Sequence, residues 1–215
     1  MKNNINFQQK LDKKLVEIMN DEKVPNLLLH ACCAPCSSYV LEYLAKYFRI
    51  TVFFYNPNIA PKEEFDKRVF ELKRFLQDFP TKYPVSIMVG EYHPEEFELI
   101  AKGYEQEPER GARCYRCYEQ RLEATAKMCK QEGFDYFTTT LSISPYKNAN
   151  WLNEIGERLA DTYETSYLVA DFKKKNGYKR SIELSEEYQL YRQDYCGCIY
   201  SKAEREQKLK EMEES

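Results

Sequence analysis

Seven of the eight cysteines in this chain of 215 residues fall into three short segments that lie far apart in the sequence. The segments are HACCAPCSS (30–38), ARCYRC (112–117) and DYCGCIY (194–200), and Cys129 stands alone. Disulfide frameworks usually spread half-cystines along a chain, whereas metal sites collect them at C-x2-C spacing on short turns. A fold that uses these thiols together must bring three distant segments to one place.

The spacing within the segments does not name a metal. Cys33 and Cys36, and likewise Cys114 and Cys117, have the C-x2-C spacing that suits either a four-cysteine zinc or an iron-sulfur cluster. Zinc takes four thiolates, whereas a 4Fe-4S cluster takes three or four and leaves the others for a second metal or for redox work. The surplus of thiols favours iron-sulfur, with zinc and disulfides as alternatives. Cys129 lies on an apolar helical stripe and is expected to be a packing residue.

Composition and charge argue against a strongly basic protein and against a membrane-spanning one. Thirty-two basic and 35 acidic side chains give a formal charge of -3, so no global positive field attracts the chain to nucleic acid or membrane. No apolar run approaches the roughly 18 to 20 residues of a membrane span. The polar N-terminus lacks the apolar core of a signal peptide, and we expect a cytoplasmic protein without membrane contact.

Apolar periodicity predicts alternating strands and helices. Such βαβαβ alternation with short connections is typical of a parallel sheet covered by helices on both faces, so the predicted class is α/β. The expected strands are 26–30, 49–55, 85–89 and 135–141, and the expected helices are 7–20, 39–48, 61–79, a helix from 115 to Gly133, and 151–160.

We expect one domain over residues 1–215, with a peripheral N-terminal helix at 7–21. Residues 91–117 are charged and interrupted by proline and glycine, and are predicted to be a small insertion that carries cysteines beside the site. Residues 203–215 are nearly all charged and are predicted to form a frayed, exposed helix.

The first cysteine segment follows a predicted strand and precedes a predicted helix. Ligands of open parallel sheets bind beyond the carboxyl ends of the strands, where helix N-termini stabilise negative charge. Cys36 is therefore expected to have thiolate character. Gly197 allows close approach of the backbone between Cys196 and Cys198. We expect all three segments to converge there, with His30 either functional or a hydrogen-bonded core residue.

Two basic segments contain aromatic residues, the combination that phosphate pairing and base stacking require. On its own, a run of charged residues usually forms a solvent-exposed surface without a binding function. Beside a predicted redox centre, it favours a nucleic-acid substrate. The candidate RNA-binding residues are Arg113, Tyr115, Arg116, Tyr118, Lys173, Lys174, Lys175, Lys179 and Arg180.

Several long motifs together resemble the cobalamin-independent, QueH-type epoxyqueuosine reductases. They are HACCAPCSSYVLEYL, YNPNIAP, ARCYRCYEQRLEATA, TTTLSISPYKN and ADFKKKNGYKRSIELSEEYQLYRQDYCGC, within residues 26–201. The strand-loop-helix opening also resembles the Rossmann-like adenine-nucleotide α-hydrolase fold. Cys-Cys-Ala-Pro-Cys replaces the glycine-rich pyrophosphate loop of that fold, which argues against ATP binding there.

The resemblance implies reduction of epoxyqueuosine at the tRNA wobble position to queuosine, the last step of queuosine biosynthesis. It implies a 4Fe-4S cluster with a neighbouring mononuclear iron, and a low-potential electron donor such as ferredoxin or flavodoxin. The candidate cofactor ligands are Cys32, Cys33, Cys114, Cys117, Cys196 and Cys198, and Cys36 is a further metal ligand. The resemblance does not assign particular sulfurs to either metal.

The reaction also needs a proton donor, for which Asp194 and Tyr195, with Tyr191, are candidates because they adjoin Cys196. Two alternatives remain at this point. One is an iron-sulfur-dependent tRNA sulfur-transfer enzyme, which needs ATP. The other is a zinc-bound nucleic-acid-binding module without catalysis.

Overall fold

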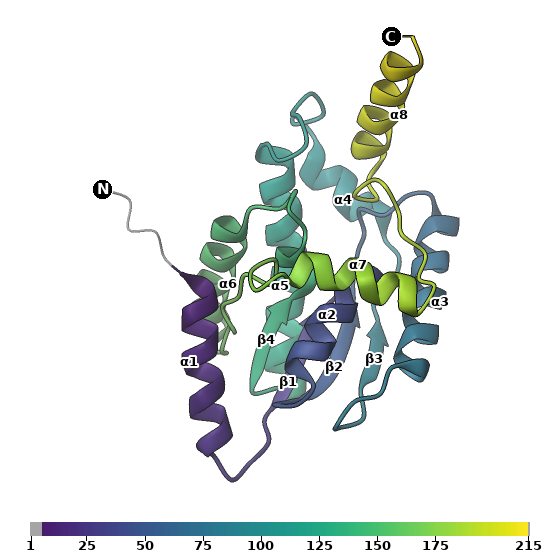
Figure 1. Cartoon of the computed structure of the whole chain (residues 1–215). Coiled ribbons are helices and arrows are strands. Elements are labelled where there is room, and N and C mark those ends of the chain that lie inside the picture. Colours follow the sequence, from purple (N-terminus) through teal and green to yellow (C-terminus); the bar gives the residue numbers. More distant parts are fainter. Residues whose placement is uncertain (1–5, 215) are drawn as a thin grey trace.

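The computed structural model describes residues 6–214, and a four-stranded sheet of order β3-β2-β1-β4 forms its centre (Figure 1). Residues 1–5 and 215, the two ends of the predicted domain 1–215, lie outside the described residues. Every strand pair is parallel, which confirms the predicted α/β class. The strands are β1 (Asn26–His30), β2 (Arg49–Phe54), β3 (Ser86–Val89) and β4 (Tyr136–Thr139).

Alternate residues of the central strands enter two separate cores. Leu27 and Leu29 of β1 pack into one core, whereas Leu28 between them packs into the other. In β2 the same period places Val52 and Phe53 on opposite faces. Side chains of a strand alternate between the faces of its sheet, so both faces of this sheet must be covered by helices.

Helices cover both faces. The core on the Leu27 face includes residues of α1 (Phe7–Asn20), α2 (Ala34–Leu44), α3 (Lys62–Asp78) and α7 (Gly177–Glu187). The core on the Leu28 face includes residues of α5 (Ala112–Glu132) and α6 (Ala149–Tyr163). Figure 1 shows α7 crossing α2 as an outer layer, and α8 (Ile199–Glu213) projecting from the body towards the C-terminus.

Strand order reverses between β1 and β4. From β1 the chain proceeds to β2 and β3 on one side, and it then returns to place β4 on the other side of β1. In open parallel sheets, such a switch point leaves a crevice beyond the carboxyl ends of the two strands. The first cysteine segment follows β1 directly, so the topology places its thiols at this crevice.

The first cysteine segment is a helix start rather than a loop between the predicted strand 26–30 and the predicted helix 39–48. Helix α2 begins at Ala34, five residues before the predicted start at Tyr39, and ends at Leu44. The sulfur of Cys33 accepts a hydrogen bond from the backbone N–H of Cys36 and so caps the helix. Pro35 occupies the first turn, where its missing N–H has no cost. The expectation of a loop was wrong because cysteine is not read as a capping residue.

The structure corrects three further expectations. The predicted insertion contains a helix, α4 (Pro94–Ala101), and α5 begins at Ala112 rather than Tyr115. Strand β4 ends at Thr139, and residues Thr140–Ile143 form the 3-10 helix η1. The charged tail is helical from Ile199 to Glu213, as predicted in kind.

Among the described residues, no helix is both long and apolar enough to span a lipid bilayer.

Candidate metal centre

The tightest group of thiols lies at the N-terminus of α2. The sulfurs of Cys32, Cys33 and Cys36 all lie within 4.8 Å of one another, and those of Cys32 and Cys33 are 3.8 Å apart. A metal bound tetrahedrally by sulfurs at about 2.3 Å separates neighbouring sulfurs by about 3.8 Å. The three thiols therefore have the spacing of ligands to a single metal ion.

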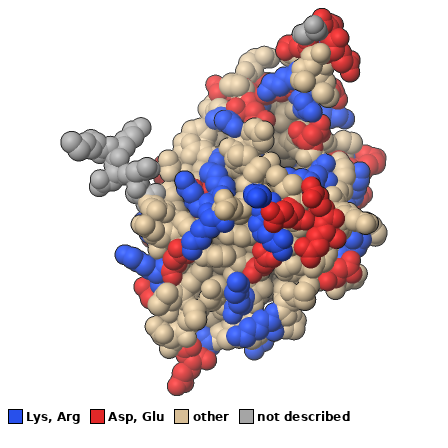
Figure 2. Space-filling model, in the orientation of Figure 1, with Lys and Arg blue, Asp and Glu red and all other residues tan. Residues whose placement is uncertain are grey.

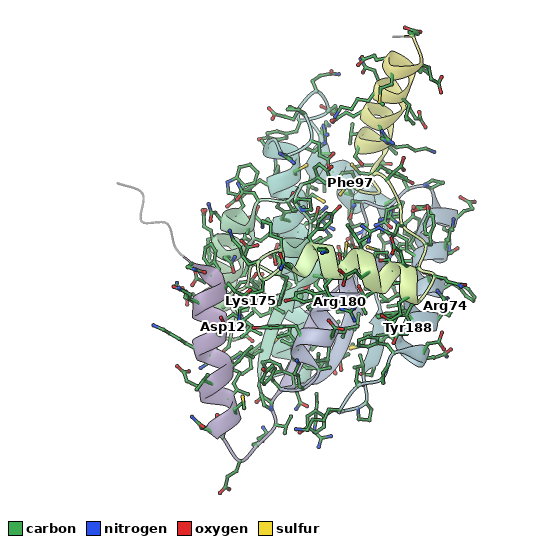
Figure 3. All side chains as sticks on the ribbon, in the orientation of Figure 1. Asp12, Arg74, Phe97, Lys175, Arg180 and Tyr188 are labelled. Carbon is green, nitrogen blue, oxygen red and sulfur yellow. The ribbon has the colours of Figure 1, made fainter. Side chains whose placement is uncertain are left out.

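A second group lines a small cavity of about 20 Å³ beside the first turn of α5. Cys114 and Cys117 come from the first two turns of α5, and Cys198 caps α8, where its sulfur accepts a hydrogen bond from the backbone N–H of Ser201. Cys196 completes the lining. Phe97 and Ala101 of α4 pack against Cys117 and Cys198, so the predicted insertion closes this cavity from outside; Figure 3 labels Phe97 near the base of α8.

Cys196 joins the two groups. It lines the small cavity and also a cleft of about 500 Å³ that Cys32 and Cys36 border. Next to it, Gly197 has φ +120°, and a Cβ there would lie 3.1 Å from the Arg68 guanidinium and from Ile59. Glycine is required for this path. The structure thus brings all three cysteine segments together. Cys129 is buried elsewhere and forms a hydrogen bond with the Thr165 hydroxyl.

One thiol of the tight group has an acidic character. Hydrogen bonds from Cys33 and Cys36 hold the pKa of Cys32 well below its ordinary value, and the positive charges of Lys147 and Arg121 add to this. Burial raises the pKa of Cys33 to about 12. Hydrogen bonds with Cys32 and Cys33, together with burial, raise the pKa of Cys36 well above its ordinary value, so the thiolate character expected for Cys36 belongs to Cys32 instead. A metal ion would displace the remaining protons.

Three arginines are buried around the thiols. Arg68 and Arg113 form ion pairs with Glu64 and Glu204, at 2.7 and 3.3 Å. Arg121 has no carboxylate partner among residues 6–214. Each guanidinium has one buried nitrogen without a hydrogen-bond partner. Buried cations need an anion. A set of sulfur donors surrounded by buried arginines fits a metal centre that is held by thiolates.

The cleft contains residues that sequence reasoning missed. Lys147 follows η1 and Arg192 precedes the last cysteine pair, and both line the cleft. Burial opposes the charge on Lys147, but the ionisable thiol and phenol groups of Cys196, Tyr118 and Cys32 raise its pKa well above the ordinary value. Tyr146 is 58% exposed, and the guanidinium of Arg110 lies 5.2 Å from its ring. In the sequence, Tyr146 follows a turn at Pro145, and nothing there indicates that its ring is exposed at the cleft.

Two of the three candidate proton donors lie at the cleft. Asp194 and Tyr195 line it. The carboxylate of Asp194 is exposed and pairs with Arg205 of α8 at 2.9 Å. The ring of Tyr195 is less exposed and lies 5.6 Å from the Arg68 guanidinium. Tyr191 donates instead to Glu64, outside the cleft lining.

His30 is a core residue. It is fully buried, with one ring nitrogen 2.9 Å from the Thr139 hydroxyl and the other 3.1 Å from the Tyr55 carbonyl. Burial, with the nearby charge of Arg121, lowers its pKa to about 3. Of the two expectations for His30, the hydrogen-bonded core residue is the one the structure contains.

The candidate RNA-binding residues fall into different environments. Arg113 and Tyr118 are buried, and Tyr115 packs edge-on against Trp151. Arg116 is exposed and lies over the Tyr104 ring. In the second segment, ion pairs hold Lys173 to Asp171, Lys175 to Asp12 and Arg180 to Glu42; Figure 3 shows Lys175 beside Asp12. Lys174 and Lys179 are exposed.

An α/β protein with a group of thiols that could hold a metal, beside a cleft at the carboxyl edge of its sheet, is the class that this fold and site define. Residues 27–204 match the family model described as epoxyqueuosine reductase QueH. The chain belongs to this family, whose members are oxidoreductases.

Relatives are similar over most of the chain. Epoxyqueuosine reductase QueH of Streptococcus pyogenes serotype M1 is 43% identical over 206 residues, which are 92% of this chain and 81% of that protein. That of Staphylococcus epidermidis is 44% identical over 94% of this chain and 87% of its own length. That of Thermotoga maritima is 34% identical over 86% of this chain and 95% of its own length.

Proposed function

We propose that this chain reduces epoxyqueuosine at the wobble position of tRNA to queuosine. The observation that carries the proposal is the convergence of seven thiols beside one cleft, in a chain of the epoxyqueuosine reductase QueH family. All eight cysteines are free, which suits a reducing compartment, and we infer a cytoplasmic enzyme.

The geometry favours a division of the thiols between two metals. We assign a 4Fe-4S cluster to Cys114, Cys117, Cys196 and Cys198, and a single iron to Cys32, Cys33 and Cys36. The 3.8 Å separation of the Cys32 and Cys33 sulfurs suits one ion. A cluster holds its thiolates farther apart, because irons and sulfides lie between them. Among the described residues, only Cys32, Cys33 and Cys36 form a three-ligand group within 4.8 Å.

The reaction converts an epoxide, two electrons and two protons into an alkene and water. When bound, the cluster supplies electrons one at a time from a ferredoxin- or flavodoxin-like donor, and the single iron supplies a Lewis acid. The protein must deliver a proton to the departing oxygen. Tyr195 suits this role better than Asp194, because its hydroxyl-bearing ring is partly enclosed and lines the cleft beside Cys196. Asp194 is already paired with Arg205.

The cleft suits a nucleoside that has left its base stack. Its volume of about 500 Å³ lies within the usual range of ligand sites. At its rim, the exposed ring of Tyr146 backed by Arg110 provides a flat surface for an unpaired base. Arg192 and Lys208 also line the cleft and are suited to phosphate contacts. Lys173, Lys174, Lys175, Lys179 and Arg180 remain candidates for more distant phosphates.

The start of α2 disfavours a sulfur-transfer enzyme that uses ATP. A pyrophosphate would need free backbone N–H groups at this helix N-terminus. Here the N–H of Cys36 donates to the Cys33 sulfur, and three thiols occupy the space in front of the helix.

Nucleoside analysis of tRNA from a strain lacking this chain tests the proposal. We expect epoxyqueuosine to accumulate and queuosine to disappear. The wild-type chain and a Cys129→Ala variant should restore queuosine, whereas a Cys114→Ser, Cys117→Ser variant should not. Unchanged queuosine in the deletion strain would contradict the function. Anaerobically purified protein that is colourless with one zinc would contradict the iron centre and favour the zinc-bound module.

A further inference from the structure

Arg121 joins the two groups of thiols through hydrogen bonds. In α5 its Nε donates to the carbonyl oxygen of Cys117, at 3.2 Å. Its Nη1 donates to the side-chain oxygen of Asn56, at 3.3 Å, and the Asn56 amide donates to the Ala31 carbonyl, at 2.8 Å. Ala31 directly precedes Cys32. A buried chain of contacts thus runs from one thiol-bearing segment to the other.

The charge of Arg121 also lacks a carboxylate partner. Its side chain is 1% exposed, and no carboxylate of residues 6–214 pairs with it. Its Nη2 has no hydrogen-bond partner. Burial of an ionised group without an opposite charge is strongly unfavourable. The groups that can become negative beside it are the thiols of the small cavity that Arg121 lines, Cys114, Cys117, Cys196 and Cys198, which lose their protons when they hold a metal.

The other buried arginines differ in this respect. Arg68 pairs with Glu64 and Arg113 pairs with Glu204, so each forms a nearly neutral unit. Arg121 therefore contributes a net positive charge to the interior of the site. That charge would be balanced when thiolates hold an anionic metal centre.

We propose that Arg121 is a positioning residue that supplies a fixed positive charge to the thiolate-held centre. Its hydrogen bonds also hold the two thiol groups in a fixed position relative to each other. The inference rests on the proposed function in requiring an iron-sulfur centre. A centre that gains an electron becomes more negative, and the charge of Arg121 favours this reduced form. Its removal must lower the reduction potential.

The test measures iron and sulfide per chain and the midpoint potential of anaerobically reconstituted protein, by redox titration followed by electron paramagnetic resonance. We expect Arg121→Gln to lower the ratio of reduced to oxidised centre at least tenfold at a fixed potential, a shift of about 59 mV for one electron. Arg121→Lys should retain a potential close to that of the wild type, because it retains the charge.

Two further variants keep the test decisive. Asn56→Asp places a carboxylate against Arg121 with little change of shape, and should lower the potential as Arg121→Gln does. Arg113→Gln with Glu204→Gln removes an ion pair whose guanidinium lines the same cavity as Arg121, and should leave the potential unchanged because no net charge is lost.

Some outcomes would overturn the inference. Wild-type potentials in both Arg121→Gln and Asn56→Asp would do so, as would an equal shift in the neutral-pair variant. Wild-type protein that takes up no iron would overturn the proposed function, and this inference with it. The two failures are distinguishable, because only the second affects the wild-type chain.

Discussion

At the scale of single residues, the cleft separates two neighbours that the sequence presents as equivalent. Asp194 extends towards α8 and pairs with Arg205, whereas Tyr195 lies against the Arg68 guanidinium. Both adjoin Cys196, but the side chains of consecutive residues point in different directions. The tertiary contacts of each side chain therefore decide which of them can reach a bound base.

We predict that Tyr195→Phe slows epoxide reduction by about a hundredfold, since loss of a general acid typically costs this much. Iron content should stay at the wild-type level, because the ring and its packing remain. Single-turnover reduction of epoxyqueuosine-containing tRNA measures the rate. Asp194→Asn is the matched control and should change the rate little. A wild-type rate in Tyr195→Phe would exclude it as the donor.

Glu71 shows how one carboxylate positions the approach to the site. Its oxygens accept hydrogen bonds from Arg74, at 2.7 Å, and from the backbone N–H of Tyr191, at 2.8 Å. Arg74 also donates to the Tyr188 carbonyl, and Figure 3 shows these two residues together at the end of α7. Helix α3 thereby holds the segment that leads to Cys196.

We expect this contact to make stability depend on pH. The hydrogen bond from Arg74, with that from Tyr191, lowers the pKa of Glu71 in the folded state below its ordinary value of 4.5. The stabilisation is therefore complete above about pH 5 and is lost as pH falls through 4.5 towards the lowered pKa. Glu71→Gln should reduce the free energy of unfolding by about 2 kcal/mol at pH 7. Urea denaturation at pH 7 and pH 4 measures this, and a constant difference between the two proteins would contradict the prediction.

At the scale of elements, the N-termini of three helices and one turn at a glycine place the thiols around the site. Helices α2 and α8 each begin at a cysteine whose sulfur caps the helix. Helix α5 carries its pair in the first two turns. The positive end of a helix dipole favours negative charge near these thiols, but burial outweighs it and raises the pKa of Cys33, Cys117 and Cys198. Gly197 then connects Cys196 and Cys198 along a path that other residues rarely adopt.

Gly197→Ala should destabilise the fold by about 2 kcal/mol and reduce the iron bound per chain. The reason is both its positive φ and the 3.1 Å approach of a Cβ to Arg68 and Ile59. Gly103→Ala is the control, since Gly103 also has a positive φ, +83°, but a Cβ there would have no other atom within 4 Å. It should lose about 1 kcal/mol of stability and no iron. Thermal denaturation and iron analysis distinguish the two variants, and full iron content in Gly197→Ala would refute the prediction.

At the scale of the whole molecule, charge is arranged locally rather than globally. Figure 2 shows basic side chains over the face of α7 with acidic side chains among them. Several of these cations, including Lys175 and Arg180, are already paired with carboxylates. The formal charge of -3 is thus compatible with an RNA substrate only where cations and an exposed ring gather at the cleft.

We predict that Tyr146→Ala weakens binding of an anticodon stem-loop RNA by about tenfold to a hundredfold, because a stacked base contributes about 1–3 kcal/mol. Fluorescence anisotropy at fixed salt concentration measures the affinity. Tyr83→Ala is the matched control, since Tyr83 also lies next to an arginine, Arg49 at 5.4 Å, but at the amino end of the sheet. Equal losses in both variants would contradict a base-stacking surface at the cleft.

Much of the fold follows from local patterns. The four strands and the helices around them match the apolar periodicity, because period and burial are properties of each segment alone. Helices α4 and α7 were missed because their sequences are charged and their stability comes from packing on neighbours, as with Phe97 of α4 and Leu184 of α7. The start of α2 was missed because a thiol caps it.

The sequence by itself determined the α/β class, the three thiol-bearing segments and the family to which the chain belongs, since each of these resides in residue types and their spacing. Only the tertiary structure decided how seven thiols divide between two groups, and which basic residues are exposed at the cleft. Arg113 and Arg121 look like surface cations in the sequence, yet both are buried beside thiols. The reason is physical: charge and spacing are written along the chain, but the partner that makes a buried charge stable comes from a segment distant in sequence.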